Sequence, residues 1–409
     1  MNEVKKVIQR REYLEWLKAF KDKQIIKVVS GVRRCGKSTL LDLYENYLLE
    51  NEVEKKQIIK INFESLEYID LLDFMEAYKY IDERLLPDKK NYIFLDEVQN
   101  VNQFERFVDD LFIKENCDVY ITGSNAYFLS GELATYLSGR YVQLKMQPLS
   151  FAEFFESEKS INFNADRNII FQKYLQQGGF PYLEKYENSR MEIENYLEDL
   201  YNTVLVKDVL TRLKVTDINI LDNIAKFMLH SIGNRISPQK ISNALKSTGK
   251  KTDPKTVDRY LRGLTDSLIL YEVDRFDVKG KKYLTDLKKY YTVDIGLRNR
   301  IVSGKESDLG HILENIVYLE LVRRYKNVYV GSIDKDGEID FVVKNEDAFE
   351  YYQVSVSIMD PAVLEREIKP LKNIEDNYPK YLLTMDPVIL AADYDGIERK
   401  NIVDWLLGK

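Results

Sequence analysis

A phosphate-binding pattern, G-x-x-x-x-G-K-S/T, is met at every fixed position by Gly31-Val32-Arg33-Arg34-Cys35-Gly36-Lys37-Ser38. The two glycines let successive backbone N–H groups point inward around phosphate oxygens, where a Cβ would obstruct the turn. Lys37 would give its charge to the β and γ phosphates, and the Ser38 hydroxyl would be a ligand of Mg²⁺. The spacing therefore predicts a nucleotide phosphate site made of Gly31, Val32, Arg33, Arg34, Cys35, Gly36, Lys37, Ser38 and Thr39.

Two carboxylates, Asp96 and Glu97, follow directly on the apolar run Tyr92-Ile-Phe-Leu. Beside a phosphate loop, Asp96 is expected to hold Mg²⁺ and Glu97 to polarise the water that attacks the γ-phosphoryl group. An acidic pair at a strand end can also be a solvated terminus or a helix N-cap. The base-reading element N-K-x-D of GTP-binding proteins does not occur downstream, so the predicted nucleotide is ATP.

Composition places the chain among folded proteins. Its 409 residues are 44% hydrophobic and 31% charged, which excludes global disorder. The 60 basic and 67 acidic residues give a net charge of −7, which excludes a uniformly cationic coat for nucleic acid. Residues 240–300 nevertheless hold fifteen Lys or Arg against eight Asp or Glu, a local excess of +7. Any DNA contact is therefore expected in that segment.

Cysteine content and hydropathy bear on the cellular setting. Cys35 and Cys117 are too few for a disulfide framework in a chain of this length. Alternating charges near the start leave no secretory h-region, and no apolar stretch reaches the ~20 residues that cross a bilayer. The sequence therefore predicts a cytoplasmic protein without a membrane segment.

The elements that would position these residues alternate between strands and helices. Short β-rich runs occur at residues 24–30, 57–63, 92–95, 119–122 and 141–146, separated by helical periodicity. Such alternation is typical of an α/β fold with a mostly parallel sheet. The predicted ATPase core is 1–148, and the largely helical stretch 149–216, broken at Gly178-Gly179-Phe180-Pro181, is a predicted helical lid.

Residues 217–303 are predicted to form a winged helix-turn-helix. Three helical patterns precede a β-rich run, a Lys-Gly-Lys-Lys turn and a return strand. Basic side chains on the third helix and the turn suit phosphate contacts with double-stranded DNA more than base reading. The alternative is a protein-docking lid with solvated lysines. The predicted DNA contacts are Lys255, Arg259, Arg262, Lys279, Lys281 and Lys282.

Residues 304–409 are predicted to form a further α/β unit, with a helix, three strands, a helix, a strand and a terminal helix in that order. The chain shows no internal repeat and no long Pro/Gly linker, so its units are expected to pack on one another.

Several short segments are familiar in combination. They are Gly-Val-Arg-Arg-x-Gly-Lys-Ser, Phe-Leu-Asp-Glu-Val-Gln, Ile-Thr-Gly-Ser-Asn, Leu-Ser-Gly-Arg-Tyr, Pro-Leu-Ser-Phe-x-Glu-Phe and Gly-Gly-Phe-Pro. Over nearly its whole length the chain resembles the prokaryotic AAA-type ATPases that carry a C-terminal domain of unknown function with a restriction-endonuclease-like fold. The resemblance implies a P-loop AAA-type ATPase core, a winged helix and a nuclease-like tail.

Positions along the chain also suggest roles for residues near the predicted phosphate site. Asn125, or Ser124 beside it, takes the place of a sensor that hydrogen-bonds the γ-phosphate, although either could cap a helix. Arg140 could reach the γ-phosphate of a neighbouring subunit in a homo-oligomer, or could be a surface arginine paired with a carboxylate. Asn62 could hold Glu97 inactive, or could be a turn residue.

In the C-terminal unit, Glu314, Asp340 and Gln353 align with the E…D…(E/Q)-x-K pattern of such nucleases. In that pattern carboxylates hold Mg²⁺ and the lysine positions a water. Glu320 lies on the same predicted helix as Glu314. Ser355 stands where the pattern has lysine and cannot supply that charge, so the nuclease-like unit is expected to be degenerate.

These features together predict a Mg²⁺-dependent ATPase, with ATP and Mg²⁺ at its site, that couples nucleotide state to a DNA-binding winged helix and a nuclease-like domain. Two alternatives stay open. One is a nucleotide-controlled switch whose output is protein binding, and the other is a DNA nuclease gated by ATP.

Overall fold

The structure is a computed structural model, which describes residues 7–123, 137, 139–186, 189–210, 213, 217–250, 252–280, 282–302, 308–333, 337–387 and 392–409. The chain divides into two compact units, Met1–Pro148 with Asp266–Leu268, and Leu149–Thr265 with Ile269–Lys409. No helix in the described ranges combines the length and apolarity that crossing a bilayer requires.

The first unit is built on a five-stranded parallel sheet with the order β2-β3-β4-β1-β5. Strands β1, β3 and β4 are buried along their whole length, as expected when both faces of a parallel sheet are covered. All five strands predicted from the sequence are confirmed. They are β1 (Ile26–Gly31), β2 (Ile58–Asn62), β3 (Asn91–Asp96), β4 (Cys117–Gly123) and β5 (Tyr141–Met146).

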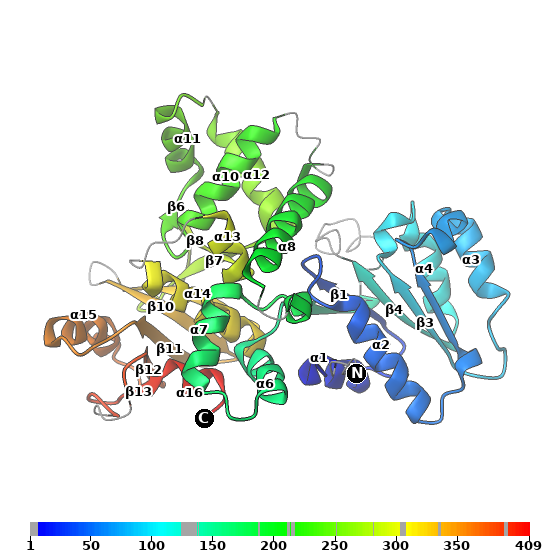
Figure 1. The fold of residues 1–409 in the computed structure, drawn as a ribbon, viewed down its shortest axis with the longest axis horizontal. Helices are drawn as coiled ribbons and strands as arrows, with labels where there is room; N and C mark the ends of the chain where they lie inside the picture. The colour runs from blue at the N-terminus through cyan, green and yellow to red at the C-terminus, as the bar shows by residue number, and fades with distance from the viewer. Residues whose placement is uncertain are drawn as a thin grey trace. The chain divides into compact units, whose positions relative to one another are not determined.

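Helices cover both faces of this sheet (Figure 1). Tyr44 of α2 packs on Phe94 and Tyr120, with ring centroids 6.1 and 5.1 Å apart. Alternate strand residues such as Ile93 and Val119 face the other side, where α3 and α4 bury their apolar stripes. The helices are α1 (Arg11–Ala19), α2 (Lys37–Glu50), α3 (Phe74–Asp82) and α4 (Phe104–Ile113), with 3-10 turns at Lys55–Gln57, Leu66–Leu72 and Val98–Asn100.

The second unit begins with a group of helices. Helix α13 packs against α7, α8 and α10, and the double glycine follows α7 directly. The helices are α6 (Phe151–Ile161), α7 (Arg167–Gln177), α8 (Arg190–Thr203), α10 (Ile218–His230), α11 (Pro238–Ser247), α12 (Pro254–Asp266) and α13 (Ile295–Ile301), with a 3-10 helix at Pro181–Tyr186 and a π-helix at Val204–Leu210.

An eight-stranded mixed sheet forms the rest of the second unit, in the order β13-β12-β11-β10-β9-β7-β8-β6. On one face Tyr318 of α14 stacks on Tyr291 at 4.6 Å, and on the other Ile368 and Leu371 of α15 pack on Val342. The elements are β6 (Arg235–Ile236), β7 (Leu270–Asp277), β8 (Lys282–Thr292), α14 (Leu309–Arg324), β9 (Val328–Ile333), β10 (Gly337–Asn345), β11 (Ala348–Ser355), α15 (Pro361–Lys372), β12 (Lys380–Thr384), β13 (Ile397–Asn401) and α16 (Ile402–Leu406).

The hairpin β7–β8 belongs to this larger sheet, a continuity that the sequence did not indicate. Strand β7 pairs in parallel with β9 from Arg275↔Val330 to Asp277↔Ser332. This pairing satisfies backbone groups that a free hairpin edge would leave exposed. The stretches 217–303 and 304–409 therefore share one sheet. Strand β13, at the far edge, was also absent from the predicted elements.

Candidate nucleotide site and C-terminal acid cluster

The phosphate loop connects β1 to α2 and has the tight turn that its glycines predict. Gly36 has φ 103° and Arg34 has φ 68°, both in the left-handed region. A Cβ on Gly31 would lie 2.4 Å from the carbonyl oxygen of Met146 and 2.7 Å from the Sγ of Cys35, so only glycine fits there. The loop leads into the N-terminus of α2, where free backbone N–H groups favour an anion.

Lys37, the first residue of α2, keeps its amine inside the loop. The Nζ donates to the carbonyl oxygens of Gly31 at 3.3 Å and Val32 at 3.4 Å, and lies 3.5 Å from the Oε1 of Glu97. Because the side chain is buried, its charge acts with little screening by water. An ammonium in this position can bind the β and γ phosphates of a nucleotide.

Asp96 ends β3 beside the first turn of α2. Its carboxylate accepts hydrogen bonds from the hydroxyls of Thr122 and Ser38. Burial raises the pKa of Asp96 above its ordinary value, while these two hydrogen bonds act against the rise. A carboxylate and a hydroxyl in contact are oxygen donors of the kind that Mg²⁺ prefers. The pair Ser38 and Asp96 therefore fits the ion predicted for it.

Glu97 follows β3 in a left-handed conformation with φ 54°. Its backbone N–H donates to the Oγ1 of Thr122 at 3.0 Å, and its Oε2 accepts from the Nε2 of Gln99 at 2.7 Å. A non-glycine residue in this conformation stores backbone strain, which is common at functional sites. The strained turn and its two partners hold the Glu97 carboxylate beside Lys37.

Arg10, which the sequence did not indicate as part of the site, contacts the phosphate loop through its guanidinium. Its Nη1 donates to the carbonyl oxygen of Cys35 at 3.1 Å and its Nη2 to that of Gln147 at 2.7 Å. The C=O and N–H of a trans peptide point in opposite directions. Fixing the Cys35 carbonyl therefore also fixes the direction of the Gly36 N–H. We call Arg10 a positioning residue for the loop.

The other residues predicted near the phosphates differ in their surroundings. Arg33 pairs with Glu64 at 2.8 Å, and Thr39 is exposed on the first turn of α2. Cys35 is buried, and burial raises the pKa of its thiol. The Oδ1 of Asn62 accepts from the backbone N–H of Glu64 at 2.9 Å, which is the turn role rather than a contact with Glu97.

The two residues predicted to sense the γ-phosphate, Ser124 and Asn125, lie outside the described residues. Arg140 is described, and its guanidinium pairs with Asp109 of α4 and lies 5.7 Å from the ring centroid of Phe112. With 42% of its side chain exposed, Arg140 stays accessible from solvent. Its ion pair corresponds to the surface arrangement considered as the alternative for this residue.

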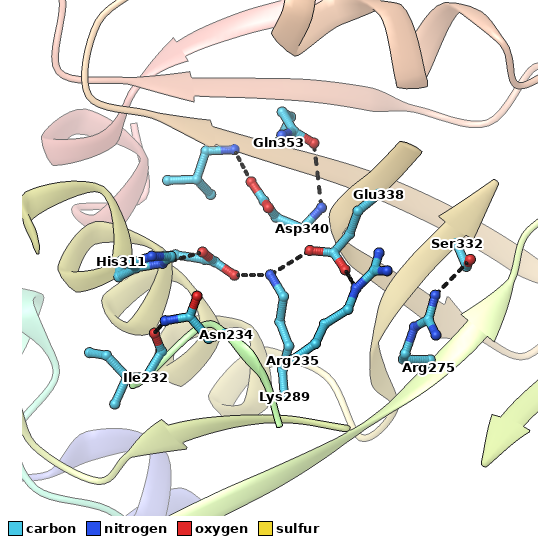
Figure 2. Close-up of polar contacts among 12 residues, drawn as sticks. Ile232, Asn234, Arg235, Arg275, Lys289, His311, Ser332, Glu338, Asp340 and Gln353 are labelled. Atoms are coloured by element: carbon cyan, nitrogen blue, oxygen red, sulfur yellow. Dashed lines mark hydrogen bonds and ion pairs between the residues drawn. The ribbon is translucent and has the colours of Figure 1, made fainter. Parts of the chain in front are cut away.

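In the second unit, an acid cluster gathers where the nuclease-like residues were predicted (Figure 2). The Nζ of Lys289, on β8, lies 2.7 Å from the Oε1 of Glu314 on α14 and 2.7 Å from the Oε1 of Glu338 on β10. Burial opposes the charge of Glu314, but Lys289, His311 and Tyr291 together outweigh it and lower the pKa of that carboxyl. Lys289 was not among the predicted residues, because it lies on a different strand from the pattern.

Asp340 and Gln353 lie next to this cluster on adjoining strands. The Oδ2 of Asp340 accepts from the backbone N–H of Val354 at 2.8 Å, and the Oε1 of Gln353 accepts from the backbone N–H of Asp340 at 3.4 Å (Figure 2). Burial, reinforced by Glu314, raises the pKa of Asp340 well above its ordinary value. Over the described parts of the chain, no three His, Cys, Asp or Glu side chains are placed to hold a metal ion. Glu314, Asp340 and Gln353 are therefore neighbours without being a formed metal centre.

The predicted DNA contacts on α12 share one helix face. Lys255, Arg259 and Arg262 recur at helical spacing and are all exposed, with Arg262 paired to Asp258 at 3.0 Å. The opposite face of the helix, which includes Val257, is buried. Basic side chains at this spacing form a continuous strip along the helix.

The other basic side chains of residues 240–300 are divided between the surface and the core. Lys279 is exposed in the β7–β8 turn, whereas Lys281 and the side chain of Lys282 lie outside the described parts. Lys289 and Arg298 are buried in ion pairs. The excess positive charge of 240–300 is thus only partly available to a ligand.

The parallel sheet, the phosphate loop and the carboxylates at the end of β3 define a P-loop ATPase of the AAA type. In agreement, residues 23–155 match the family described as an AAA domain. A second family, a domain of unknown function (DUF8612), matches residues 168–308.

The chain belongs to the same family as an uncharacterized protein of Haemophilus influenzae, with which it shares 38% identity over 98% of this chain and 99% of that protein. The uncharacterized protein MJ1544 of Methanocaldococcus jannaschii is 30% identical over 93% of this chain and 85% of that protein. Among solved structures, the Walker-type ATPase PABY2304 of Pyrococcus abyssi is 16% identical and gives a TM-score of 0.46, covering 72% of this chain and 96% of that one. AMPPCP-bound DnaA from Aquifex aeolicus is 14% identical with a TM-score of 0.34, covering 64% of this chain and 90% of that one.

Proposed function

We propose that this AAA-type protein hydrolyses ATP with Mg²⁺ and uses its nucleotide state to control DNA binding by residues 217–303. The observation that carries the hydrolysis proposal is the gathering of Lys37, Asp96 and Glu97 at the phosphate loop. Thr122 joins the two acidic residues by one hydrogen bond to each. Such a set supplies a phosphate cation, an oxygen donor for the metal and a general base within one site.

Each residue has a role in this proposal. Lys37 binds the β and γ phosphate oxygens, and Glu97 accepts a proton from the water that attacks the γ-phosphorus while the bond to ADP breaks. Ser38 and Asp96 would hold Mg²⁺, which supplies positive charge to the phosphates when bound. Arg10 keeps the loop N–H groups directed at the anion.

The DNA-binding part of the proposal is supported by element order and charge. Helix α10, the short strand β6, helices α11 and α12 and the hairpin β7–β8 follow one another, and β6 pairs with β8. This order suits a winged helix whose last helix, α12, presents Lys255, Arg259 and Arg262 to phosphates. The proposed domains are 1–148 for the ATPase core, 149–216 for a lid, 217–303 for the winged helix and 304–409 for a nuclease-like domain, the last two of which share the eight-stranded sheet.

DNA-stimulated ATP turnover tests this coupling. The wild-type chain should release phosphate faster with duplex DNA, and the stimulation should fall as salt rises, because phosphate contacts release counterions. The triple variant Lys255→Ala, Arg259→Ala, Arg262→Ala should keep its basal turnover and lose the stimulation. A matched control removes three lysines at the surface of the first unit, Lys55, Lys56 and Lys89, whose side chains are 72%, 61% and 40% exposed, and should behave as wild type.

Turnover that is indifferent to DNA at every salt concentration would refute the coupling and favour a nucleotide-controlled switch for a protein partner. Equal loss in the α12 variant and the control would show that net charge, rather than this helix face, is responsible.

We also propose that the nuclease-like domain is degenerate. Its support is the order of α14, β9, β10, β11, α15 and β12, together with the serine at position 355. Plasmid incubated with the protein, ATP and Mg²⁺ or Mn²⁺ should stay supercoiled. Nicking that disappears in Asp340→Ala would contradict degeneracy and support an ATP-gated nuclease.

A further inference from the structure

The acid cluster of the second unit, formed by Glu314, Glu338 and Asp340, already contains a cation of the chain itself. The ammonium of Lys289 lies between two carboxylates that come from α14 and β10, at 2.7 Å from each (Figure 2). Lys289 and Glu314 are both buried, and 22% of the Glu338 side chain is exposed. A cation so enclosed is poorly screened and strongly attracted to its partners.

Both carboxylates that contact Lys289 also contact other donors or cations. Glu314 accepts from the hydroxyl of Tyr291 on Oε1, and its Oε2 lies 3.5 Å from the Nδ1 of His311. Glu338 uses its Oε2 for Arg235, whose Nε lies 2.6 Å away. Each of the four oxygens of these two carboxylates already faces a donor or a cation, and an added ion would need several oxygen ligands.

Asp340 is held differently from the other two acids. One of its oxygens accepts from the backbone N–H of Val354, and no basic side chain is hydrogen-bonded or ion-paired with it among the contacts of the described residues. Glu314, Glu338 and Lys289 all act electrostatically on Asp340, so the group is mutually close. The third acid therefore lies next to the cation that the first two share.

We infer that Lys289 is the resident cation of the acid cluster, standing where a nuclease-like site would hold a divalent ion, and that removing it converts Glu314, Glu338 and Asp340 into a divalent-metal site. The Mg²⁺ implied by the nuclease resemblance does not fit while Lys289 is present, because it would meet a like charge on oxygens already in use. A metal needs oxygens at about 2.1 Å. The two carboxylates would each move inward from the 2.7 Å at which they bind the ammonium. This inference goes beyond ATP hydrolysis and concerns a different site.

Manganese binding to the full chain without added nucleotide tests the inference. We expect the wild type to bind no Mn²⁺ that depends on Asp340, and Lys289→Met to gain one Mn²⁺ per chain, as measured by electron paramagnetic resonance of the free ion. The gained site should disappear in Lys289→Met with Asp340→Asn. The matched control is Lys288→Met, since Lys288 is the preceding residue on β8 and pairs instead with Glu272 and Asp274.

Two results would overturn the inference. Wild-type protein that binds Mn²⁺ and loses it in Asp340→Asn would show that the cluster accepts a metal beside Lys289. A folded Lys289→Met variant that gains no Mn²⁺ would show that the carboxylates do not form a site. If Lys289→Met does not fold, Lys289→Met with Glu338→Gln removes one negative charge along with the cation. That double variant should bind Mn²⁺ through Glu314 and Asp340, and a lack of binding would equally overturn the inference. None of these measurements depends on ATP turnover.

Discussion

The Nζ of Lys37 lies 3.5 Å from the Oε1 of Glu97, so the proposed phosphate-binding cation and the proposed general base are in direct contact. Both side chains are buried, which strengthens the attraction between their charges. A nucleotide phosphate at the loop would compete with Glu97 for the ammonium of Lys37. In the proposed mechanism, phosphate binding would therefore release the Glu97 carboxylate to receive a proton.

Removing Arg10 should weaken nucleotide binding, because Arg10 fixes a carbonyl of the phosphate loop. Arg10→Ala leaves the carbonyl oxygens of Cys35 and Gln147 without this donor, and we expect roughly 10-fold weaker ATP binding, about 1.4 kcal/mol. Arg10→Lys should not restore affinity, because an ammonium lacks the planar fork that reaches both oxygens. Arg11→Ala, at an exposed neighbour, is the control. Unchanged ATP affinity in folded Arg10→Ala, measured by calorimetry, would show that the contact does not shape the loop.

Thr122 should position both acidic residues of the site. Thr122→Val keeps the shape but removes the donor to Asp96 and the acceptor for the Glu97 N–H. We expect kcat to fall roughly 10-fold to 100-fold, because leaving buried polar groups unpaired costs about 1–3 kcal/mol. The Mg²⁺ concentration needed for half-maximal turnover should rise. Thr122→Ser, which retains the hydroxyl, should restore both. A valine variant with unchanged Mg²⁺ dependence of turnover would argue for a packing role alone.

Removal of Arg140 should lower ATP turnover if Arg140 completes the site of a neighbouring subunit. Arg140→Ala is expected to reduce kcat by about 10³-fold or more without weakening ATP binding, as for an arginine that reaches a neighbour's γ-phosphate. Asp109→Asn breaks the ion pair of Arg140 and keeps the guanidinium, so its turnover should stay close to wild type. Mixing Arg140→Ala with Lys37→Ala should restore activity, since mixed subunits can form one complete site. No recovery in the mixture would count against a shared site.

Asp294 should give the second unit a specific pH dependence. Its carboxylate accepts from the backbone N–H groups of Gly179 at 2.6 Å and Leu297 at 2.9 Å, and burial raises its pKa to about 6 despite these bonds. The folded state therefore binds this proton more tightly than the unfolded state, and the contribution to stability is lost as pH rises from about 4 to 6.

Comparison with Asp294→Asn isolates this effect. The free energy of unfolding of the wild type, relative to that of Asp294→Asn, should increase by about 2 kcal/mol when pH is lowered from 7 to 4, because the folded state binds the proton more tightly. Urea unfolding across that range measures the difference, with Asp217→Asn at the exposed cap of α10 as the control. Parallel curves for wild type and Asp294→Asn would contradict the raised pKa.

Much of the first unit could be predicted from the sequence because its signals are local. The phosphate loop has fixed residues at fixed spacing, and the apolar runs of the parallel strands stand out from their helical surroundings. The placement of Thr122 beside Asp96 was not predicted, since it depends on the register in which β4 pairs with β3. Arg10 was missed for a similar reason, because its partners are distant backbone carbonyls that no pattern of residue types reveals.

In the second unit, prediction from the sequence was limited by strand pairing between distant segments. Its helices and most of its strands follow from periodicity, but the pairing of β7 with β9 joins segments that look independent along the chain. The local pattern places a lysine at position 355, where the chain has serine, whereas the lysine that contacts Glu314 is Lys289 from another strand. Long-range pairing decides both features, and a local pattern carries no information about it.

The most direct test of the ATPase account is Mg²⁺-dependent phosphate release by wild type and Glu97→Gln, measured beside ATP binding. We predict that Glu97→Gln binds ATP as well as wild type and hydrolyses it about 10²-fold to 10⁴-fold more slowly, because the amide cannot accept the proton of the attacking water. Lys37→Ala should fail to bind ATP, while Lys60→Ala, at a lysine of the same unit paired with Asp42 and Glu45, should bind and turn over normally. Wild-type rates of hydrolysis in Glu97→Gln would contradict the account.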